Sequence, residues 1–148
     1  MRFPRLLLAV LASAVLLPGG QGTPQVHYFG HEQVSTALAG TDHFSVLLNA
    51  PDLIVMCSHR KGPGHVELHV KESDVFYVTD GEGTLITGGK MVGSHVSSPD
   101  QLTGTDIIGG EAHHLSKGDV IVIPAGIPHW FKEVPHSISY FVVKGLKQ

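Results

Sequence analysis

The chain alternates short apolar runs with tight turn sequences over most of its length. The runs are rich in β-branched and aromatic residues, which favour strands. The turns between them, such as 61–64, 80–83 and 109–110, consist largely of glycine with proline or aspartate. The runs that we predict as strands are Phe44–Leu48, Leu53–His59, His65–Val70, Val75–Thr79, Thr84–Thr87, Thr105–Ile108, Val120–Ile123, Trp130–Phe131 and Ile138–Val143. Short strands at this spacing predict an all-β sandwich or barrel.

Two other segments complete the organisation of the chain. Residues His31–Leu38 predict a short helix ahead of the first strand. Lys90–Gly104 contains few strand formers and predicts a loop, which we expect at the rim of the barrel or as a lid. Residues 23–148 supply enough chain for a single core, so we predict one domain over this range.

The N-terminus predicts a secretory signal peptide over residues 1–22. Arg2 and Arg5 precede the apolar run Leu6–Leu17, and small residues follow at Gly20 and Gly22. The run is shorter than the ~20 residues of a comfortable membrane span. An uncleaved anchor is the alternative to a cleaved leader. The expected location is secreted or periplasmic, with no membrane attachment after cleavage.

Composition narrows the function further. The formal net charge is −3, and no basic stripe with interleaved aromatic residues occurs, which argues against nucleic acid as a partner. Cys57 is the single cysteine, so no internal disulfide can form. Because Cys57 follows an apolar strand and no neighbour would lower its pKa, we interpret it as an inert thiol in the core.

Polar side chains interrupt the apolar pattern at one point. His65, Glu67 and His69 share one strand face by the two-residue period, and Asp74 opens the next run. A fifth polar group, His129, follows a stiff corner of two prolines and a glycine, which gives its backbone a well-defined position. Convergence of these side chains predicts a polar site with metal-competent groups.

These same residues resemble the two sequence motifs of the cupin superfamily. Glu67-x-His69-x4-Asp74 takes the place of H-x-H-x4-E in the first motif, and Gly81 ends it at the expected spacing. The second motif is G-x5-P-x-G-x2-H-x3-N. It is matched at the expected spacings by Gly118, Pro124, Gly126 and His129, with Glu133 in place of the asparagine. The resemblance is to a small, single-domain cupin of the conserved-barrel type, here with an export leader.

The cupin resemblance implies a jelly-roll β-barrel, often a homodimer, with a divalent metal ion inside. By position, the ligands would be Glu67, His69, Asp74 and His129. Two histidines with carboxylates suit Mn or Fe(II), and Zn accepts the same donors. Aspartate is one methylene shorter than the usual glutamate, so His65 is the alternative ligand to Asp74. A hydrogen-bonded polar network without metal is the alternative to a metal site.

Several functions fit such a barrel. The first hypothesis is a metal-dependent enzyme that acts on a small molecule by dioxygenase, decarboxylase, isomerase or lyase chemistry. The second is a non-catalytic barrel that binds a small ligand or a metal, and a storage protein is a weaker third. We interpret His113 and His114 as surface or rim residues, with a place in the lining of the pocket as the alternative, and Trp130 and Phe131 as core residues. The remaining histidines are scattered and are assigned no role.

Overall fold

The computed structural model describes residues 25–39 and 44–146. The predicted signal peptide, residues 1–22, lies outside the described residues. The elements in chain order are α1 (His31–Leu38), β1 (Phe44–Asn49), β2 (Leu53–Arg60), β3 (Val66–His69), β4 (Glu72–Thr87), β5 (Lys90–Val92), β6 (His95–Ser98), β7 (Gln101–Gly104), β8 (Asp106–Ile108), β9 (Glu111–Ser116), β10 (Val120–Ile123), β11 (His129–Glu133) and β12 (Ile138–Leu146). Within the described residues, no helix is long and apolar enough to cross a membrane.

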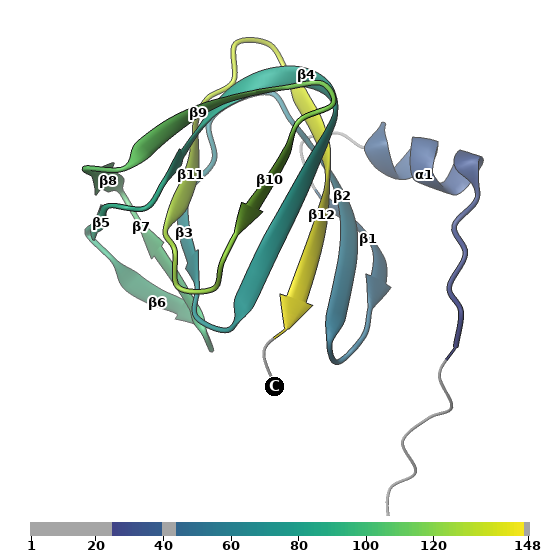
Figure 1. Ribbon diagram of the computed structural model, residues 1–148, viewed down its shortest axis with the longest axis horizontal. Helices are drawn as coiled ribbons and strands as arrows, with labels where there is room; N and C mark the ends of the chain where they lie inside the picture. Colours follow the sequence, from purple (N-terminus) through teal and green to yellow (C-terminus); the bar gives the residue numbers. More distant parts are fainter. Residues whose placement is uncertain (1–24, 40–43, 147–148) are drawn as a thin grey trace, which may run out of the picture.

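The strands curl into a barrel of two sheet faces that share β4 (Figure 1). The pairing order along the main sheet is β1-β2-β12-β4-β11-β3-β7-β6, and β9 and β10 also pair with β4. The first half of β4 pairs with β12 and β10, while its second half pairs with β9 and β11. This architecture confirms the predicted all-β jelly-roll barrel.

The long strand β4 corrects one prediction from the sequence. Residues 80–83 were expected to be a turn between two strands, but β4 continues through them as a bend. Gly81 makes this bend possible, because its φ is +74° and a Cβ there would overlap the carbonyl oxygen of Ser137 on the neighbouring chain segment. A β-bulge in the pairing with β12 lies beside the bend, between Ser139 and Tyr140.

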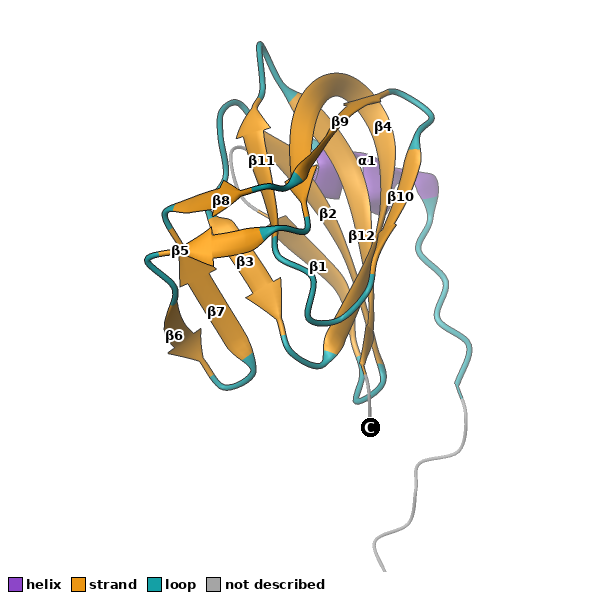
Figure 2. Cartoon of the chain, turned by 60° about the vertical axis from the view of Figure 1, so that its left-hand side comes forward, coloured by secondary structure: helices purple, strands orange, loops and turns teal. Residues whose placement is uncertain are grey.

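Two further segments differ from expectation. Residues 90–104 contain β5, β6 and β7 rather than a loop, and these lie with β8 on the side of the barrel away from α1 (Figure 2). Strand β9, which carries His113 and His114, was not predicted as a strand. The helix α1 has the predicted bounds and contacts β1 and β2.

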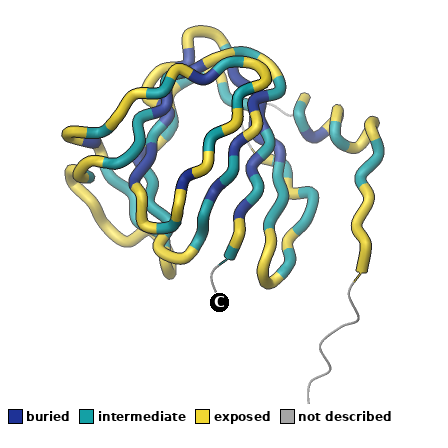
Figure 3. The backbone as a smooth tube through the Cα atoms, viewed as in Figure 1, coloured by how far each residue is buried: buried dark blue, intermediate teal, exposed yellow. Residues whose placement is uncertain are grey.

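The core fills the space between the two faces of the barrel. Buried positions alternate with less buried ones along β4 and over much of β12, as expected for strands with one face turned inward (Figure 3). The core comprises Phe76, Val78, Leu85, Leu115, Ile123, Phe131, Val134, Ile138, Tyr140 and Val142. Phe131 is therefore in the core as predicted, whereas Trp130 is only half-buried and donates from its indole nitrogen to the carbonyl of Gly64.

Candidate metal centre

His129 is the first residue of β11 and is held in place by the corner that precedes it. Gly126 adopts φ +83°, and the backbone N–H of Ile127 donates to the carbonyl of Pro124 at 3.2 Å. The N–H of Gly126 also donates to the carbonyl of His69, at 2.8 Å. The corner therefore fixes the backbone of one histidine relative to that of the other.

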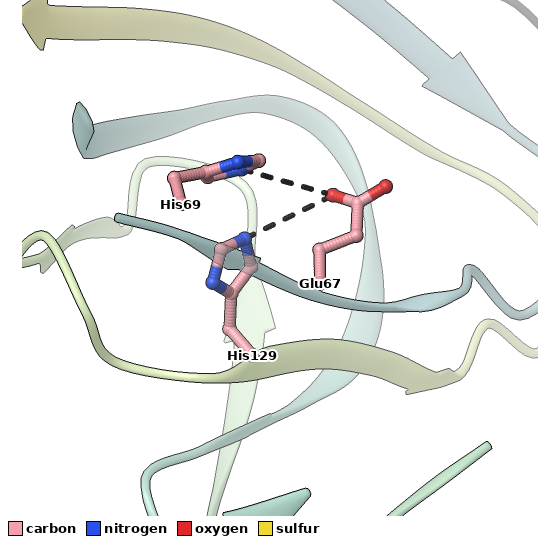
Figure 4. Close-up of side chains that lie close together, drawn as sticks. All are labelled: Glu67, His69 and His129. Carbon is pink, nitrogen blue, oxygen red and sulfur yellow. Dashed lines mark ion pairs between the residues drawn. The ribbon is translucent and has the colours of Figure 1, made fainter. Parts of the chain in front are cut away.

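Register brings Glu67 to the same place. Residue His129 of β11 is the antiparallel partner of Glu67 in β3, so their side chains project from directly opposed positions. His69 follows Glu67 by two residues and uses the same face of β3, as the sequence period predicted. Figure 4 shows the three side chains pointing toward one another.

The ring nitrogens of both histidines are oriented for ligation. His129 Nδ1 donates to the carbonyl of Ile127 at 3.2 Å, and His69 Nδ1 donates to Oε1 of Gln101. These bonds leave both Nε2 atoms facing Glu67 Oε2, at 3.9 Å from His129 and 4.0 Å from His69. A hydrogen bond to one ring nitrogen that fixes the other toward an ion is the usual arrangement around metal-bound histidine.

Asp74 completes the predicted set, but it is shared with another group. Its Oδ2 lies 3.3 Å from His69 Nε2 and 3.6 Å from His129 Nε2. Its Oδ1 accepts from Lys144 Nζ at 2.9 Å, and the same Nζ lies 3.0 Å from Oε2 of Glu72. Asp74 and Lys144 are direct register partners on β4 and β12, which places the amine against the carboxylate.

The electrostatic environment differs between the two histidines. Burial lowers the pKa of His129, which favours the neutral ring with a free lone pair on Nε2. Burial also acts to lower the pKa of His69, but the hydrogen bonds with Asp74 and Gln101 and the charge of Asp74 together outweigh it, and the pKa is raised. For Asp74, burial acts to raise the pKa, yet the hydrogen bond with His69 and the charge of Lys144 outweigh it and the pKa is lowered.

The donor set fits a metal ion. Among the described residues, His129 Nε2 is the one buried side-chain nitrogen or oxygen that has no hydrogen-bond partner. Such an orphaned atom is costly unless something pairs with it. Glu67, His69 and His129 form a group whose ligand atoms lie within 4.8 Å of one another, and His69, Glu72 and Asp74 form a second. Atoms bound at about 2.0–2.2 Å from one ion have separations of this order.

A cavity of about 270 Å³ opens onto this cluster from inside the barrel. Its wall is polar on the side of Glu67, His69 and Asp74, and apolar where Phe76 and Val142 line it. The volume lies just below the ~300–1,000 Å³ of pockets for drug-sized ligands. The interior is therefore large enough for a small molecule beside the cluster.

The structure brings all four predicted ligands together and leaves other candidates outside. His65 is exposed, precedes β3 and belongs to neither ligand group, so it does not replace Asp74. His113 Nε2 lies 2.8 Å from Oγ1 of Thr87, and His114 Nε2 lies 3.3 Å from the exposed Glu82 carboxylate. Neither belongs to a ligand group.

Sequence reasoning missed three side chains around the cluster. Glu72, Gln101 and Lys144 all line the cavity. A signal existed for Glu72, which precedes Asp74 by two residues and so shares its strand face. No comparable signal existed for the other two, because their positions depend on strand pairings that the sequence alone did not define. Cys57, in contrast, is fully buried as predicted.

Comparisons with known proteins agree with this architecture. The family described as Cupin matches residues 36–144. Similar solved structures include protein BH2720 from Bacillus halodurans, with a TM-score of 0.59 and 15% identity, covering 86% of each chain. KdgF from Halomonas sp. has a TM-score of 0.51 and 18% identity, covering 71% of this chain and 80% of its own. The DMSP lyase DddQ from Ruegeria pomeroyi has a TM-score of 0.51 and 14% identity, covering 75% of this chain and 52% of its own.

These structural likenesses are distant in sequence and support the fold alone. A search of curated protein sequences found no match. The family match, however, spans most of the chain, from α1 to the last strand. The chain therefore belongs to the cupin family.

Proposed function

We propose that this cupin is a divalent-metal-dependent enzyme that acts on a small molecule held inside the barrel. The observation that carries the proposal is the buried, unpartnered Nε2 of His129. It faces the carboxylate of Glu67 and stands beside the second imidazole, with ring centroids 5.1 Å apart. A metal ion would satisfy this nitrogen and hold the three groups in one coordination sphere.

The donor set narrows the choice of ion. Two histidines and one carboxylate with open positions are typical of non-haem Fe(II), and the same set occurs in catalytic Zn sites. Mn accepts it as well, since oxygen ligands suit that ion. Asp74 contributes one oxygen, Oδ2, because Lys144 occupies the other. We therefore propose Glu67, His69 and His129 as the primary ligands of Mn, Fe(II) or Zn, with Asp74 as the fourth.

The chain's own side chains supply the rest of the chemistry. A bound divalent ion would supply Lewis-acid polarisation of a carbonyl, carboxylate or enol oxygen. Phe76, Val142 and Met56 exclude water from one side of the cavity. Glu67, whose side chain is 45% exposed, would hold the ion from the open side of the cluster, so the ion would stay accessible to a substrate. Dioxygenase, decarboxylase, isomerase and lyase reactions all fit this arrangement, and DddQ is by name a lyase.

A non-catalytic binding barrel is the second candidate function. It is favoured by the pairing of both Asp74 and Glu72 with Lys144, which removes two carboxylates from acid–base work. A substrate-dependent oxygen-uptake assay on protein loaded with Fe(II) separates the oxygenase form of the first candidate from the second. We further propose that the protein is exported through the leader at residues 1–22 and functions as a homodimer.

The metal content of purified protein tests the proposal. Wild type loaded with Mn, Fe(II) or Zn should retain one ion per chain after removal of free metal. His129→Ala and His69→Ala should lose the ion while circular dichroism shows an intact fold, because apolar strands supply the core. His113→Ala is the matched control, since this histidine lies outside the cluster. Full occupancy in His129→Ala, or no stoichiometric ion in wild type, would overturn the metal assignment.

A further inference from the structure

Arg60 stands where two cavities of the barrel meet. It is the last residue of β2 and lines both the 270 Å³ cavity of the metal centre and a second cavity of about 420 Å³. The second cavity is formed by the end of β2 and the segment that follows it, including Lys61 and Pro63. A ligand that extended from the candidate metal centre toward the second cavity would therefore meet this guanidinium.

The guanidinium group is held by contacts on several sides. Its Nε donates to the hydroxyl of the buried Tyr140 at 3.2 Å. Its central carbon lies 5.2 Å from the ring centroid of Phe131, within cation–π range. On a third side the guanidinium packs against Gly64, where a side chain would leave it no room, since an added Cβ would lie 2.5 Å from Nη1. A cationic group fixed in this way is pre-organised to bind, because little side-chain entropy remains to be lost.

In the described part of the chain, no acidic side chain forms an ion pair with Arg60. Within residues 25–39 and 44–146, no carboxylate lies within the 4.0 Å limit of an ion pair with it, although two carboxylates meet Lys144 on the opposite side of the same cavity. The Nε atom donates to Tyr140, and among the described residues neither terminal Nη group has a hydrogen-bond or ion-pair partner that would compete for it. A half-buried charge without a partner is unfavourable, so its natural complement is an anion brought by the ligand.

We propose that Arg60 binds the carboxylate of a small organic acid whose other end lies at the metal centre. The fork of Nη1 and Nη2 matches a carboxylate in a bidentate pair. Tyr140 accepts from Arg60, so its own hydroxyl proton is free to reach the same carboxylate. The proposal rests on the metal-dependent function proposed above, whose substrate class it defines.

Charge and size favour a monoanionic carboxylate at this end over a phosphate dianion. The far end of the cavity already holds the carboxylates of Glu67, Glu72 and Asp74, so an uncompensated second charge on the ligand would be repelled. Tyr140 and Lys144 are four residues apart on β12, which is roughly 13 Å along a strand. The ligand is therefore expected to be short and extended, on the scale of a five- or six-carbon chain.

Binding of glutaramate and adipamate, which each carry one carboxylate and one amide end, to Zn-loaded protein tests the proposal by titration calorimetry. Both acids should bind wild type, and Arg60→Gln should weaken them roughly 10- to 100-fold, as expected for loss of a charge-assisted hydrogen bond. The corresponding diamides, glutaramide and adipamide, should be insensitive to the same substitution. Lys61→Gln, which removes a charge from the next residue, should change binding of the acids less than about threefold, in keeping with an exposed charge.

The variants are designed so that a folding defect does not decide the outcome. Circular dichroism checks Arg60→Gln, and Arg60→Lys keeps the charge and most of the stem but loses the fork. If Arg60→Gln fails to fold, Arg60→Lys must still weaken the acids about tenfold. Failure of either acid to bind wild type would show that there is no carboxylate site. An equal loss of affinity in Lys61→Gln would show that the acids are held by general electrostatic attraction and not by Arg60.

Metal analysis of the same samples separates this inference from the function on which it rests. If metal is retained but Arg60→Gln binds the acids as wild type does, Arg60 is not the anchor and the metal assignment stands. If wild type holds no stoichiometric metal yet binds the acids in an Arg60-dependent way, the metal assignment fails and the carboxylate site stands.

Discussion

Replacing Lys144 by methionine is expected to destabilise the metal-free protein by about 3 kcal/mol. The amine is 10% exposed and contacts Asp74 at 2.9 Å and Glu72 at 3.0 Å, so the substitution leaves two carboxylates without their cation. Breaking a buried pair by removing one partner costs about 3–5 kcal/mol. The low end applies here, because Glu72 is 18% exposed and Asp74 still faces His69 Nε2 at 3.3 Å.

The pH dependence of this effect follows from the lowered pKa of Asp74. Burial acts to raise that pKa, but the hydrogen bond with His69 and the charge of Lys144 lower it overall. A carboxyl whose pKa is depressed in the folded state stabilises the fold above its unfolded pKa of about 3.9. That contribution is lost as the pH falls through the folded pKa. The difference in stability between wild type and Lys144→Met should therefore be largest near neutral pH and shrink in acid.

Urea unfolding in the presence of a chelator, at neutral and acidic pH, measures both effects. The double variant Lys144→Met/Asp74→Asn should recover part of the loss, since it removes one of the uncompensated charges. Lys61→Met is the control, because an exposed lysine should change stability by no more than about 0.5 kcal/mol. Zn should stabilise Lys144→Met more than wild type, since both oxygens of Asp74 become free. If the free energy of unfolding of Lys144→Met at neutral pH lies within about 1 kcal/mol of that of wild type, the buried-pair reasoning is wrong.

Three further predictions concern other parts of the chain. Burial raises the pKa of the Cys57 thiol, so folded protein should react with a thiol reagent at neutral pH far more slowly than urea-unfolded protein, and equal rates would contradict the inert-thiol interpretation. Protein secreted by its own leader should lack residues 1–22 by intact mass, and a mature species that retains the apolar run Leu6–Leu17 would show that the leader is not removed. Light scattering at micromolar concentration should give a homodimer, and a monomer would remove that proposal.

Much of the fold could be predicted because apolar runs indicate the strands and turn residues indicate where the strands end. The run Val120–Ile123 has the predicted bounds, as does the helix His31–Leu38. The strand predictions were wrong where residues typical of turns lie inside a strand, or where the strands are very short. Gly81 looked like part of a tight turn, yet the positive φ that a turn would use also allows a long strand to bend. In 90–104, strands of three or four residues are too short to show a period.

The sequence predicted those parts of the candidate site that depend on neighbouring positions in the chain. The two-residue period placed Glu67 and His69 on one face, and the corner before His129 marked it as a fixed position. Lys144 contacts Asp74 across seventy positions of sequence, and only the register of β12 against β4 brings them together. Gln101 fixes the ring of His69 from a segment that was predicted as a loop. Both contacts are consequences of pairing between distant strands, which a single sequence does not specify.

Charge balance connects the proposed metal centre with the proposed carboxylate site. Glu67, Glu72 and Asp74 bring three negative charges to the cavity and Lys144 returns one positive charge, which leaves a formal excess of two negative charges. A divalent cation matches that excess, provided that both histidines are neutral. Without an ion, the raised pKa of His69 lets its proton offset part of the excess, so metal uptake should release that proton. With the ion in place, the cationic Arg60 is the remaining charge on the cavity wall, and a ligand with one free carboxylate would neutralise it. A neutral substrate would leave this charge unpaired, and a dianionic end group would add an excess that no described side chain of the cavity offsets.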